Sequence, residues 1–381
     1  MSEIHVLLGD VARIDAGIVD PTMEQYRRLP HISAEHITSV TGELRGIKTA
    51  EDDGMESGKY LFQSGNVLYS KLRPYLRKAA IPEFDGLCSA DMYPIKTDST
   101  RLRPGYLRLM LVSDRFTAFA NEASARSRMP KLNREQLFSY PCVLPSVERQ
   151  KDVEIAVQQQ LAAVEDARQA AAAQLRELTQ LANALIRETL AHPDTEPRSL
   201  GDVLLEVKQG IGSRWADFPV LGATRDGLAP AKEPVGKNPE RYKPVTVGTV
   251  FYNPMRILIG SIAMVDEGDA PGITSPDYVV LRGREGLVDS RWFYYWLRSP
   301  DGERCIASLA RGAVRERMLF NRLAEGEIAL PPYPVQQAAS RALAELRPMK
   351  AAIEARLREI ERLPQRLLAQ VFDFEEEAED A

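Results

Sequence analysis

The stretch ERQKDVEIAVQQQLAAVEDARQAAAAQLRELTQLANALIRETL, residues 148–190, contains neither glycine nor proline. Its apolar side chains recur at alternating steps of four and three residues, with one polar interruption at Arg168. This heptad pattern is typical of a helix that packs against another helix. It predicts a spacer helix over 148–192 that is roughly 60 Å long. The predicted pairing positions, called the seam below, are Val157, Leu161, Val164, Leu175, Leu178 and Leu185.

The C-terminal segment 334–374 repeats this pattern, and Lys350 interrupts it where Arg168 interrupts the first. Pro348 and Pro364 are expected to kink or restart this second helix, because proline lacks a backbone N–H and clashes with the preceding turn. The acidic residues 375–381 are expected to form a solvated tail. The predicted seam positions here are Leu343, Leu346, Ile353, Leu357, Ile360 and Leu367.

Each predicted helix follows a lobe, and the two lobes share short motifs in the same order. LGDV at 8–11 returns at 200–203, and GNVLYS at 65–70 returns as GTVFYN at 248–253. CSADMY at 88–93 resembles TSPDYV at 274–279, and LNR at 132–134 resembles FNR at 320–322. VLPSVERQ at 143–150 resembles ALPPYPVQQ at 329–337. The order predicts an internal duplication with lobe 1 at 1–147 and lobe 2 at 193–333.

Within a lobe, the patterns indicate a mixed α/β fold. GNVLYSKL and TVFYNPMRILIGSIAMV are predicted strands, and YLRLMLVSDRFTAFANEA and RWFYYWLRSPDGERCIASLA are predicted helices. The predicted fold class is therefore α/β (α+β), with two lobes separated by two long antiparallel coiled-coil helices and related by a pseudo-twofold internal repeat. The alternative is that the helices only mediate dimerisation or form a bundle core.

Composition limits the possible functions. The 381 residues include 49 basic and 54 acidic ones, which gives a formal net charge of −5. The three cysteines lack metal-type spacing and do not cluster with the four histidines, so no metal site is predicted. No apolar run is long enough to span a membrane, and the N-terminus does not resemble a secretory signal. A reduced, cytoplasmic location is expected.

Catalytic motifs are not recognisable in the sequence. There is no phosphate-binding loop and no glycine fingerprint of a dinucleotide site. Leu330-Pro331-Pro332-Tyr333 resembles the loop of amino-methyltransferases, but Leu330 stands where a hydrogen-bond acceptor is needed. The acids Glu83, Asp85 and Asp91 lack the spacing of a nuclease site. No catalytic residue is predicted, although a nuclease or a fused methyltransferase fragment remains an alternative.

Basic residues cluster at similar places in the two lobes. Arginine and lysine bind phosphates, and arginine also offers two parallel donors to guanine. The repetition of these clusters favours DNA contact over a merely solvated face. The predicted DNA-binding residues are Lys71, Arg73, Arg77, Lys78, Arg126, Arg128, Lys131 and Arg134 in lobe 1, and Lys237, Arg241, Lys243, Arg256, Arg311, Arg315, Arg317 and Arg322 in lobe 2.

GNVLYSKLRPYLRKAAIPEFDGLCSADMYPI resembles the body of a target-recognition domain in specificity subunits of Type I restriction-modification systems. MPKLNREQLFSYPCVLPSVERQ resembles the exit of such a domain into its spacer helix, and LIRETLAHP and LLAQVFDFE resemble the ends of the two spacers. The resemblance covers nearly the whole chain. It departs from the family in lobe 2, where Asn253-Pro254-Met255-Arg256 replaces the SKLRPYLRK run.

The resemblance implies a non-catalytic subunit that reads a bipartite sequence in double-stranded DNA. It implies two methyltransferase subunits as partners, with S-adenosylmethionine bound to them and no cofactor in this chain. Restriction motor subunits are an optional further partner, and the location is the prokaryotic cytoplasm. The alternatives are a specificity-like subunit of another phage-defence methylation assembly and a helical protein–protein adaptor without DNA binding.

Overall fold

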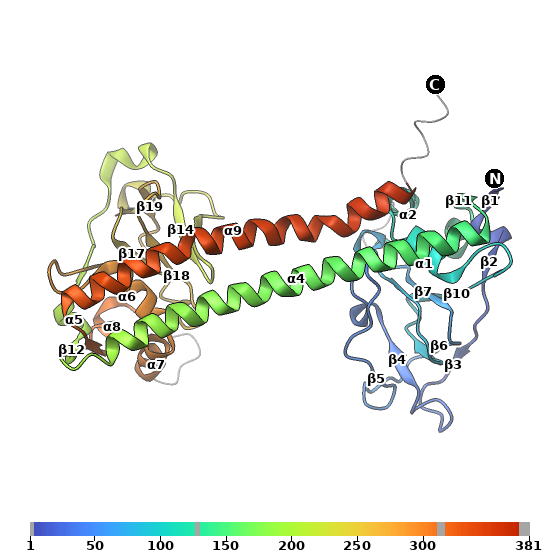
Figure 1. The fold of residues 1–381 in the computed structure, drawn as a ribbon, viewed down its shortest axis with the longest axis horizontal. Coiled ribbons are helices and arrows are strands. Elements are labelled where there is room, and N and C mark those ends of the chain that lie inside the picture. The colour runs from blue at the N-terminus through green and yellow to red at the C-terminus, as the bar shows by residue number, and fades with distance from the viewer. Residues whose placement is uncertain (1–3, 126–129, 311–316, 373–381) are drawn as a thin grey trace. The chain divides into compact units, whose positions relative to one another are not determined.

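The computed structural model describes residues 4–125, 130–310 and 317–372 (Figure 1). The chain divides into two compact units. Unit 1 comprises residues 1–171 and 356–381, and unit 2 comprises residues 172–355. Each unit holds one lobe together with parts of two long helices. Among the described residues, no helix is both long enough and apolar enough to cross a membrane.

The two long helices are α4 (Val147–Leu190) and α9 (Tyr333–Phe372), which pack together (Figure 1). In unit 1, Val157 and Leu161 of α4 share one apolar core with Leu368 near the end of α9. In unit 2, Ile186 near the end of α4 shares the other core with Leu343 near the start of α9. Within each unit, the first part of one helix therefore accompanies the last part of the other, as expected for antiparallel helices.

Helix α9 does not restart at either proline, because residues 333–372 form one uninterrupted helix. A proline removes one helical hydrogen bond and crowds the preceding turn. Pro348 follows the buried Leu346, and Pro364 lies between the buried Ile360 and Leu368. The apolar surface that these neighbours bury offsets the local cost, so the helix continues through both prolines.

Burial along α4 and α9 agrees with the predicted seam only in part, because Ile186 and Leu368, which lie outside it, are more deeply buried than their seam neighbours Leu185 and Leu367. Ile155 and Leu181, two apolar residues of α4 outside the seam, are exposed. The buried seam residues are Val157, Leu161, Leu343, Leu346 and Ile360. The half-buried ones are Val164, Leu175, Leu178, Leu185, Ile353, Leu357 and Leu367.

Each lobe contains a four-stranded antiparallel sheet with the same strand order. In lobe 1 the order is β2-β10-β7-β8, and in lobe 2 it is β13-β20-β17-β18. The lobe 1 strands are β2 (Ala12–Ile14), β10 (Met92–Thr97), β7 (Val67–Ser70) and β8 (Ala79–Ala80). The lobe 2 strands are β13 (Leu204–Glu206), β20 (Val279–Gly283), β17 (Thr249–Tyr252) and β18 (Ile262–Val265). The mixed α/β class that the sequence predicts is confirmed.

Helices cover these sheets in the same order in both lobes. Each lobe also closes with a two-stranded sheet, β1-β11 in lobe 1 and β12-β21 in lobe 2. The lobe 1 helices are α1 (Pro104–Leu111), α2 (Asp114–Ser124) and α3 (Arg134–Phe138). The lobe 2 helices are α5 (Leu200–Val203), α6 (Ser290–Leu297), α7 (Pro300–Leu309) and α8 (Phe320–Leu323). The closing strands are β1 (Ile4–Leu7), β11 (Pro141–Leu144), β12 (Glu196–Ser199) and β21 (Glu327–Leu330).

The lobes differ in their additional sheets. Lobe 1 has a five-stranded sheet in the order β3-β6-β9-β4-β5, whereas lobe 2 has the pairs β14-β15 and β16-β19. The first set is β3 (Ile18–Val19), β6 (Lys59–Phe62), β9 (Gly86–Cys88), β4 (Pro30–Ile32) and β5 (Lys48–Thr49). The second is β14 (Leu221–Thr224), β15 (Gly227–Pro230), β16 (Lys243–Val245) and β19 (Gly272–Thr274).

A fully buried glutamine near the start of each long helix attaches that helix to its lobe. The Gln150 amide donates to the carbonyls of Arg101 and Pro145, both at 2.9 Å, and accepts from the Arg103 N–H at 2.9 Å. In the second copy, Gln336 makes the equivalent three bonds with Leu287, Pro331 and Asp289 at 3.0, 2.8 and 3.0 Å. Each residue of the second set lies 186 positions after its counterpart in the first (336 − 150, 287 − 101). The backbones of the two lobes therefore correspond residue by residue around these glutamines.

The same 186-residue offset shows that one of the motif matches found in the sequence was misaligned. Asn133 precedes α3 as its N-cap, and Leu319 precedes α8 in the same position. LNR at 132–134 therefore corresponds to Met318-Leu319-Phe320 and not to FNR at 320–322. The shared Asn-Arg letters misled the comparison, because the backbone at these positions is fixed by the buried Leu132 and Met318.

Replacing Gln150 by leucine is expected to lower the free energy of unfolding by about 2–4 kcal/mol, because buried backbone groups would lose their partners. Gln336→Leu is expected to have a similar effect. Gln159→Leu, at an exposed position of α4, is the matched control. Urea unfolding of the three variants and the unmodified chain measures the difference. Equal stability of Gln150→Leu and Gln159→Leu would contradict the attachment role.

Candidate nucleic-acid interface

Three segments of lobe 1 meet at the end of β7. The Arg73 N–H donates to the Pro130 carbonyl and the Leu132 N–H to the Lys71 carbonyl, both at 2.9 Å. The Lys71 N–H donates to the Asp91 carbonyl at 3.1 Å. Residues 71–73, 130–132 and 89–91 are thus held together by backbone bonds. The basic clusters around 71–78 and 131–134, far apart in sequence, become neighbours.

Lobe 2 contains the same arrangement around an equivalent carboxylate. Asp91 lies 3.6 Å from the Lys131 ammonium, and Asp277 lies 3.0 Å from the Arg317 guanidinium. The backbone N–H of each aspartate donates to a serine two residues earlier, to Ser89 Oγ at 3.2 Å and to Ser275 Oγ at 3.3 Å respectively. Each pair of positions is again separated by 186 residues. The site was therefore duplicated together with the lobe.

The lobe 1 site combines buried and exposed positive charge. The Lys71 ammonium donates to the Ala90 carbonyl and lies 5.0 Å from the centre of the Tyr93 ring. Burial lowers the pKa of Lys71, and the positive charge of Lys131 lowers it further. Arg134 donates to the Tyr60 hydroxyl at 2.8 Å. These contacts hold the buried Lys71 and the exposed Arg134 in place beside the turn that follows Lys71.

That turn is a short 3-10 helix in each lobe, η3 (Pro74–Leu76) in lobe 1 and η6 (Ile257–Ile259) in lobe 2. Arg73 precedes η3 in the left-handed backbone region, with a φ of 50°. Arg256 precedes η6. Both arginines are exposed, and neither side chain has a partner among the described residues. They are free to contact an external anion at equivalent places.

The predicted DNA-binding residues fall into three groups. The first group bonds to the chain itself and comprises Lys71, Arg77, Lys78, Lys131, Arg134, Lys243, Arg317 and Arg322. The second group is exposed without a side-chain partner in the described parts of the chain and comprises Arg73, Lys237, Arg241 and Arg256. The third group, Arg126, Arg128, Arg311 and Arg315, lies outside the described residues.

Two members of the first group have largely structural surroundings. Arg77 forms an ion pair with Asp114, and its side chain is 14% exposed. Arg322 donates through two nitrogens to the Leu309 carbonyl at 2.9 Å, and its side chain is 15% exposed. Each links its short helix to a neighbouring helix. Sequence alone does not separate such residues from freely exposed cations, because the partners are distant in the chain.

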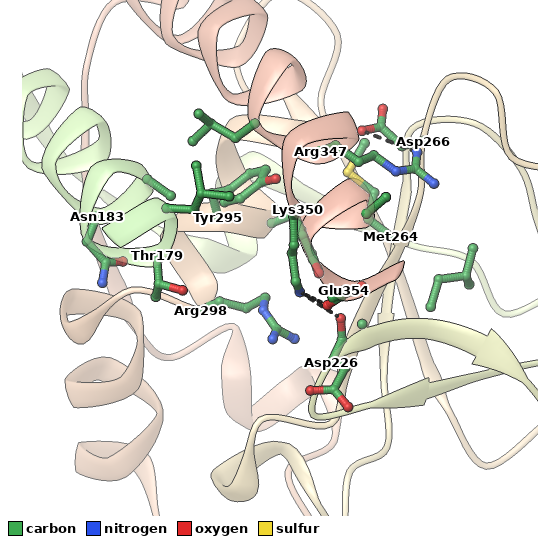
Figure 2. Close-up of a pocket in the computed structure, with 17 residues that line it drawn as sticks. Thr179, Asn183, Asp226, Met264, Asp266, Tyr295, Arg298, Arg347, Lys350 and Glu354 are labelled. Carbon is green, nitrogen blue, oxygen red and sulfur yellow. Dashed lines mark hydrogen bonds and ion pairs between the residues drawn. The ribbon is translucent and has the colours of Figure 1, made fainter. Parts of the chain in front are cut away.

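The cleft shown in Figure 2 lies in unit 2, between lobe 2 and the two long helices, and has a volume of about 400 Å³. Its positive charges are already satisfied. Arg347 pairs with Asp269, and Lys350 lies 3.6 Å from Glu354 and 3.4 Å from the Asp226 carbonyl. Arg298 donates to the Ile262 carbonyl at 2.9 Å. The cleft therefore offers no spare charge to a ligand.

One potential metal-ligand group occurs among the described residues, and sequence reasoning missed it because its members are separated in the chain. His31, His36 and Asp53 have ligand atoms within 4.8 Å of one another. His31 Nδ1 lies 3.0 Å from Asp53. Burial lowers the pKa of His31 despite this bond. Because Lys48 lies 3.9 Å from Asp53 and Lys59 is also nearby, the group is a poor site for a cation.

Comparison with known proteins relates this architecture to one family. No family model matches the sequence. A stretch of 134 residues, 35% of the chain, is 37% identical to the Type I restriction enzyme EcoDI specificity subunit of Escherichia coli. The match spans only 30% of the length of that curated relative.

Solved structures are similar over nearly the full chain. One, from work on complex assembly and conformational transition of the type I restriction-modification system, has a TM-score of 0.69 at 20% identity and covers 97% of both chains. The HsdS subunit from Thermoanaerobacter tengcongensis has a TM-score of 0.51 at 20% identity, covering 97% of this chain and 96% of that one. The S subunit from M. genitalium has a TM-score of 0.50 at 12% identity, covering 98% and 96%.

The structural likenesses establish the fold, and the match to the E. coli subunit adds a relationship in sequence. Over nearly its whole length the chain therefore has the fold of solved Type I restriction-modification specificity subunits, and about a third of it is similar in sequence to the E. coli specificity subunit.

Proposed function

We propose that the chain reads a split sequence in double-stranded DNA, with each lobe contacting one half, and that it thereby directs a Type I restriction-modification complex to its target. The supporting observation is the duplicated site, in which Asp91 and Lys131 correspond to Asp277 and Arg317. Beside each pair lies an exposed arginine, Arg73 or Arg256, whose side chain has no partner in the part of the chain that the structure describes. Arginine suits both phosphates and guanine edges.

We also propose that two methyltransferase subunits dock on the helices and lobes. Because the lobes and helices are duplicated, the chain presents two similar surfaces, and two copies of one partner suit such a chain. In this proposal the methyltransferase subunits bind S-adenosylmethionine and perform the reaction, whereas this chain is non-catalytic and needs no cofactor. Restriction motor subunits are a further partner, and the assembly works in the bacterial cytoplasm, where the chromosome lies.

Selection from random DNA tests this proposal. The chain is purified together with its methyltransferase subunits and incubated with a pool of random duplexes, and the bound DNA is sequenced. Enrichment of two fixed half-sequences separated by unread base pairs is expected. Enrichment of a single continuous site, or of none, would contradict the proposal. Methylation by the chain without partner subunits would instead favour an enzyme.

Charge reversal is expected to affect one half-site at a time. Arg73→Glu, or the double reversal of Arg126 and Arg128, should weaken discrimination at one half, and Arg256→Glu should weaken it at the other. Each lost base contact is worth about 1–3 kcal/mol. Binding to duplexes mutated in either half measures the effect, and Arg176→Glu on the exposed face of α4 is the control. Equal losses at both halves after a single reversal would count against the division.

The two long helices are proposed to set the number of unread base pairs. Inserting one heptad within residues 157–185 of α4, with a matching heptad in α9, adds about 10 Å of helix. At 3.4 Å per base pair this corresponds to about three additional unread base pairs. Sequencing of selected DNA measures the gap. A gap of unchanged length, in a variant that still binds, would refute the spacer role.

A further inference from the structure

Arg108 of α1 is a buried arginine that forms no ion pair within the described parts of the chain, although the nearby charge of Glu154 acts to raise its pKa. The residue is 6% exposed, and burial lowers its pKa to about 10. Its Nη1 donates to the carbonyls of Val40 and Thr41 at 3.0 and 2.9 Å. Its Nε and Nη2 have no partner among the described residues. An arginine side chain carries five N–H donors, so one edge of this guanidinium remains available.

The loop that receives these bonds has a strained backbone. Val40 has a φ of 63°, a conformation that a β-branched residue rarely adopts. Gly42 also has a positive φ, and a Cβ atom there would lie 2.9 Å from Arg108 Nη1 and even closer to the Ala79 carbonyl. The hydroxyl of Thr41, between them, is buried without a partner. Strained loops that the surrounding structure holds in place are common at binding sites.

A cleft of about 330 Å³ in unit 1 is lined by Thr41, Arg108 and the facing side of α4. Two carboxylates also line it, but both are neutralised. Glu43 lies 2.5 Å from Arg45, and Glu165 lies 2.6 Å from Arg168. Hydrogen bonds from Arg168 and Gln169 lower the pKa of Glu165 to about 2, so it stays ionised and paired. Each of these carboxylates is thus bonded to an arginine of its own, and neither forms an ion pair with Arg108 among the described residues.

Lobe 2 has no equivalent of this charge. Counting from the matched residues Arg103 and Asp289, the position of Arg108 corresponds to Tyr294. The lining of the unit 2 cleft holds three cations, Arg298, Arg347 and Lys350, and three carboxylates, Asp226, Asp266 and Glu354. The cation at position 108 is thus not repeated at the matched position of lobe 2.

We propose that the Arg108 cleft binds a small oxyanion, a carboxylate or a phosphate group. Two of its oxygens would accept from Nε and Nη2 of Arg108, the side-by-side donors that fit such groups. The Thr41 hydroxyl would supply a further donor. A buried cation is costly unless it is paired, so the bound anion would stabilise lobe 1. This proposal does not rest on the proposed DNA reading.

Thermal unfolding of the full chain tests the site. Acetate represents a carboxylate and inorganic phosphate represents a phosphate group, each titrated against chloride at constant ionic strength. The unmodified chain and the Arg115→Met control, at an exposed position of the same lobe, should show a saturable rise in the midpoint temperature. Arg108→Met should lose this rise. Which anion acts at the lower concentration identifies the preferred chemistry.

A second measurement covers the case in which Arg108→Met does not fold. The Nε resonance of Arg108, observed after selective ¹⁵N-arginine labelling of the unmodified chain, should shift with the same saturation. Thr41→Val keeps the cation and removes the hydroxyl, and it should weaken binding several-fold. An Nε resonance that neither anion moves, together with an unchanged midpoint temperature, would overturn the proposal.

Discussion

The structure depends on the burial of helix α4 and helix α9 within the cores of the lobes. Lobe 1 packs Val157 and Leu161 of α4 together with Leu368 and Phe372 of α9 in one apolar cluster. Lobe 2 does the same with Ile186 and Leu343, among others. A spacer that only touched its lobe at the surface could pivot. Burial of its side chains in the core fixes its direction, because close-packed interiors resist displacement.

Hydrogen bonds complete what apolar packing begins. The hydrophobic effect has no preferred direction, whereas the three bonds of each buried glutamine allow one orientation of helix against lobe. Inside the lobes, Tyr69 and Tyr252 occupy equivalent strands, and burial raises the pKa of both hydroxyls. The duplication thus preserves internal polar details together with the outline of the fold.

Much of the fold follows from patterns that are local in sequence. The long helices are predictable because the heptad rhythm continues for many turns and is free of glycine. The continuity of α9 through Pro348 and Pro364 is not predictable, because it depends on the apolar surface that neighbouring residues bury in tertiary contacts. The misaligned motif at 132–134 shows the same limit. Its Asn-Arg pair matches residues 321–322 in sequence, whereas the structure aligns it with residues 319–320.

The candidate DNA interface is less predictable than the fold. The sequence locates the basic clusters. It does not show that Arg77 forms an ion pair with Asp114, or that Arg322 donates to the Leu309 carbonyl. Those partners lie in other helices. Arg108, between apolar residues of a predicted helix, gives no sign in the sequence that its guanidinium is buried against the carbonyls of a distant loop. The exposed arginines Arg73 and Arg256 become distinctive only after the others are assigned.

The glutamine attachment has a consequence for how such a chain can diversify. The side-chain amides of Gln150 and Gln336 bond only to main-chain N–H and carbonyl groups. This attachment therefore depends on the path of the backbone and not on which side chains its partner residues carry. Lobe surfaces can therefore exchange almost any residue while the joint stays intact. Evolution can revise what each lobe contacts without rebuilding the connection to its helix.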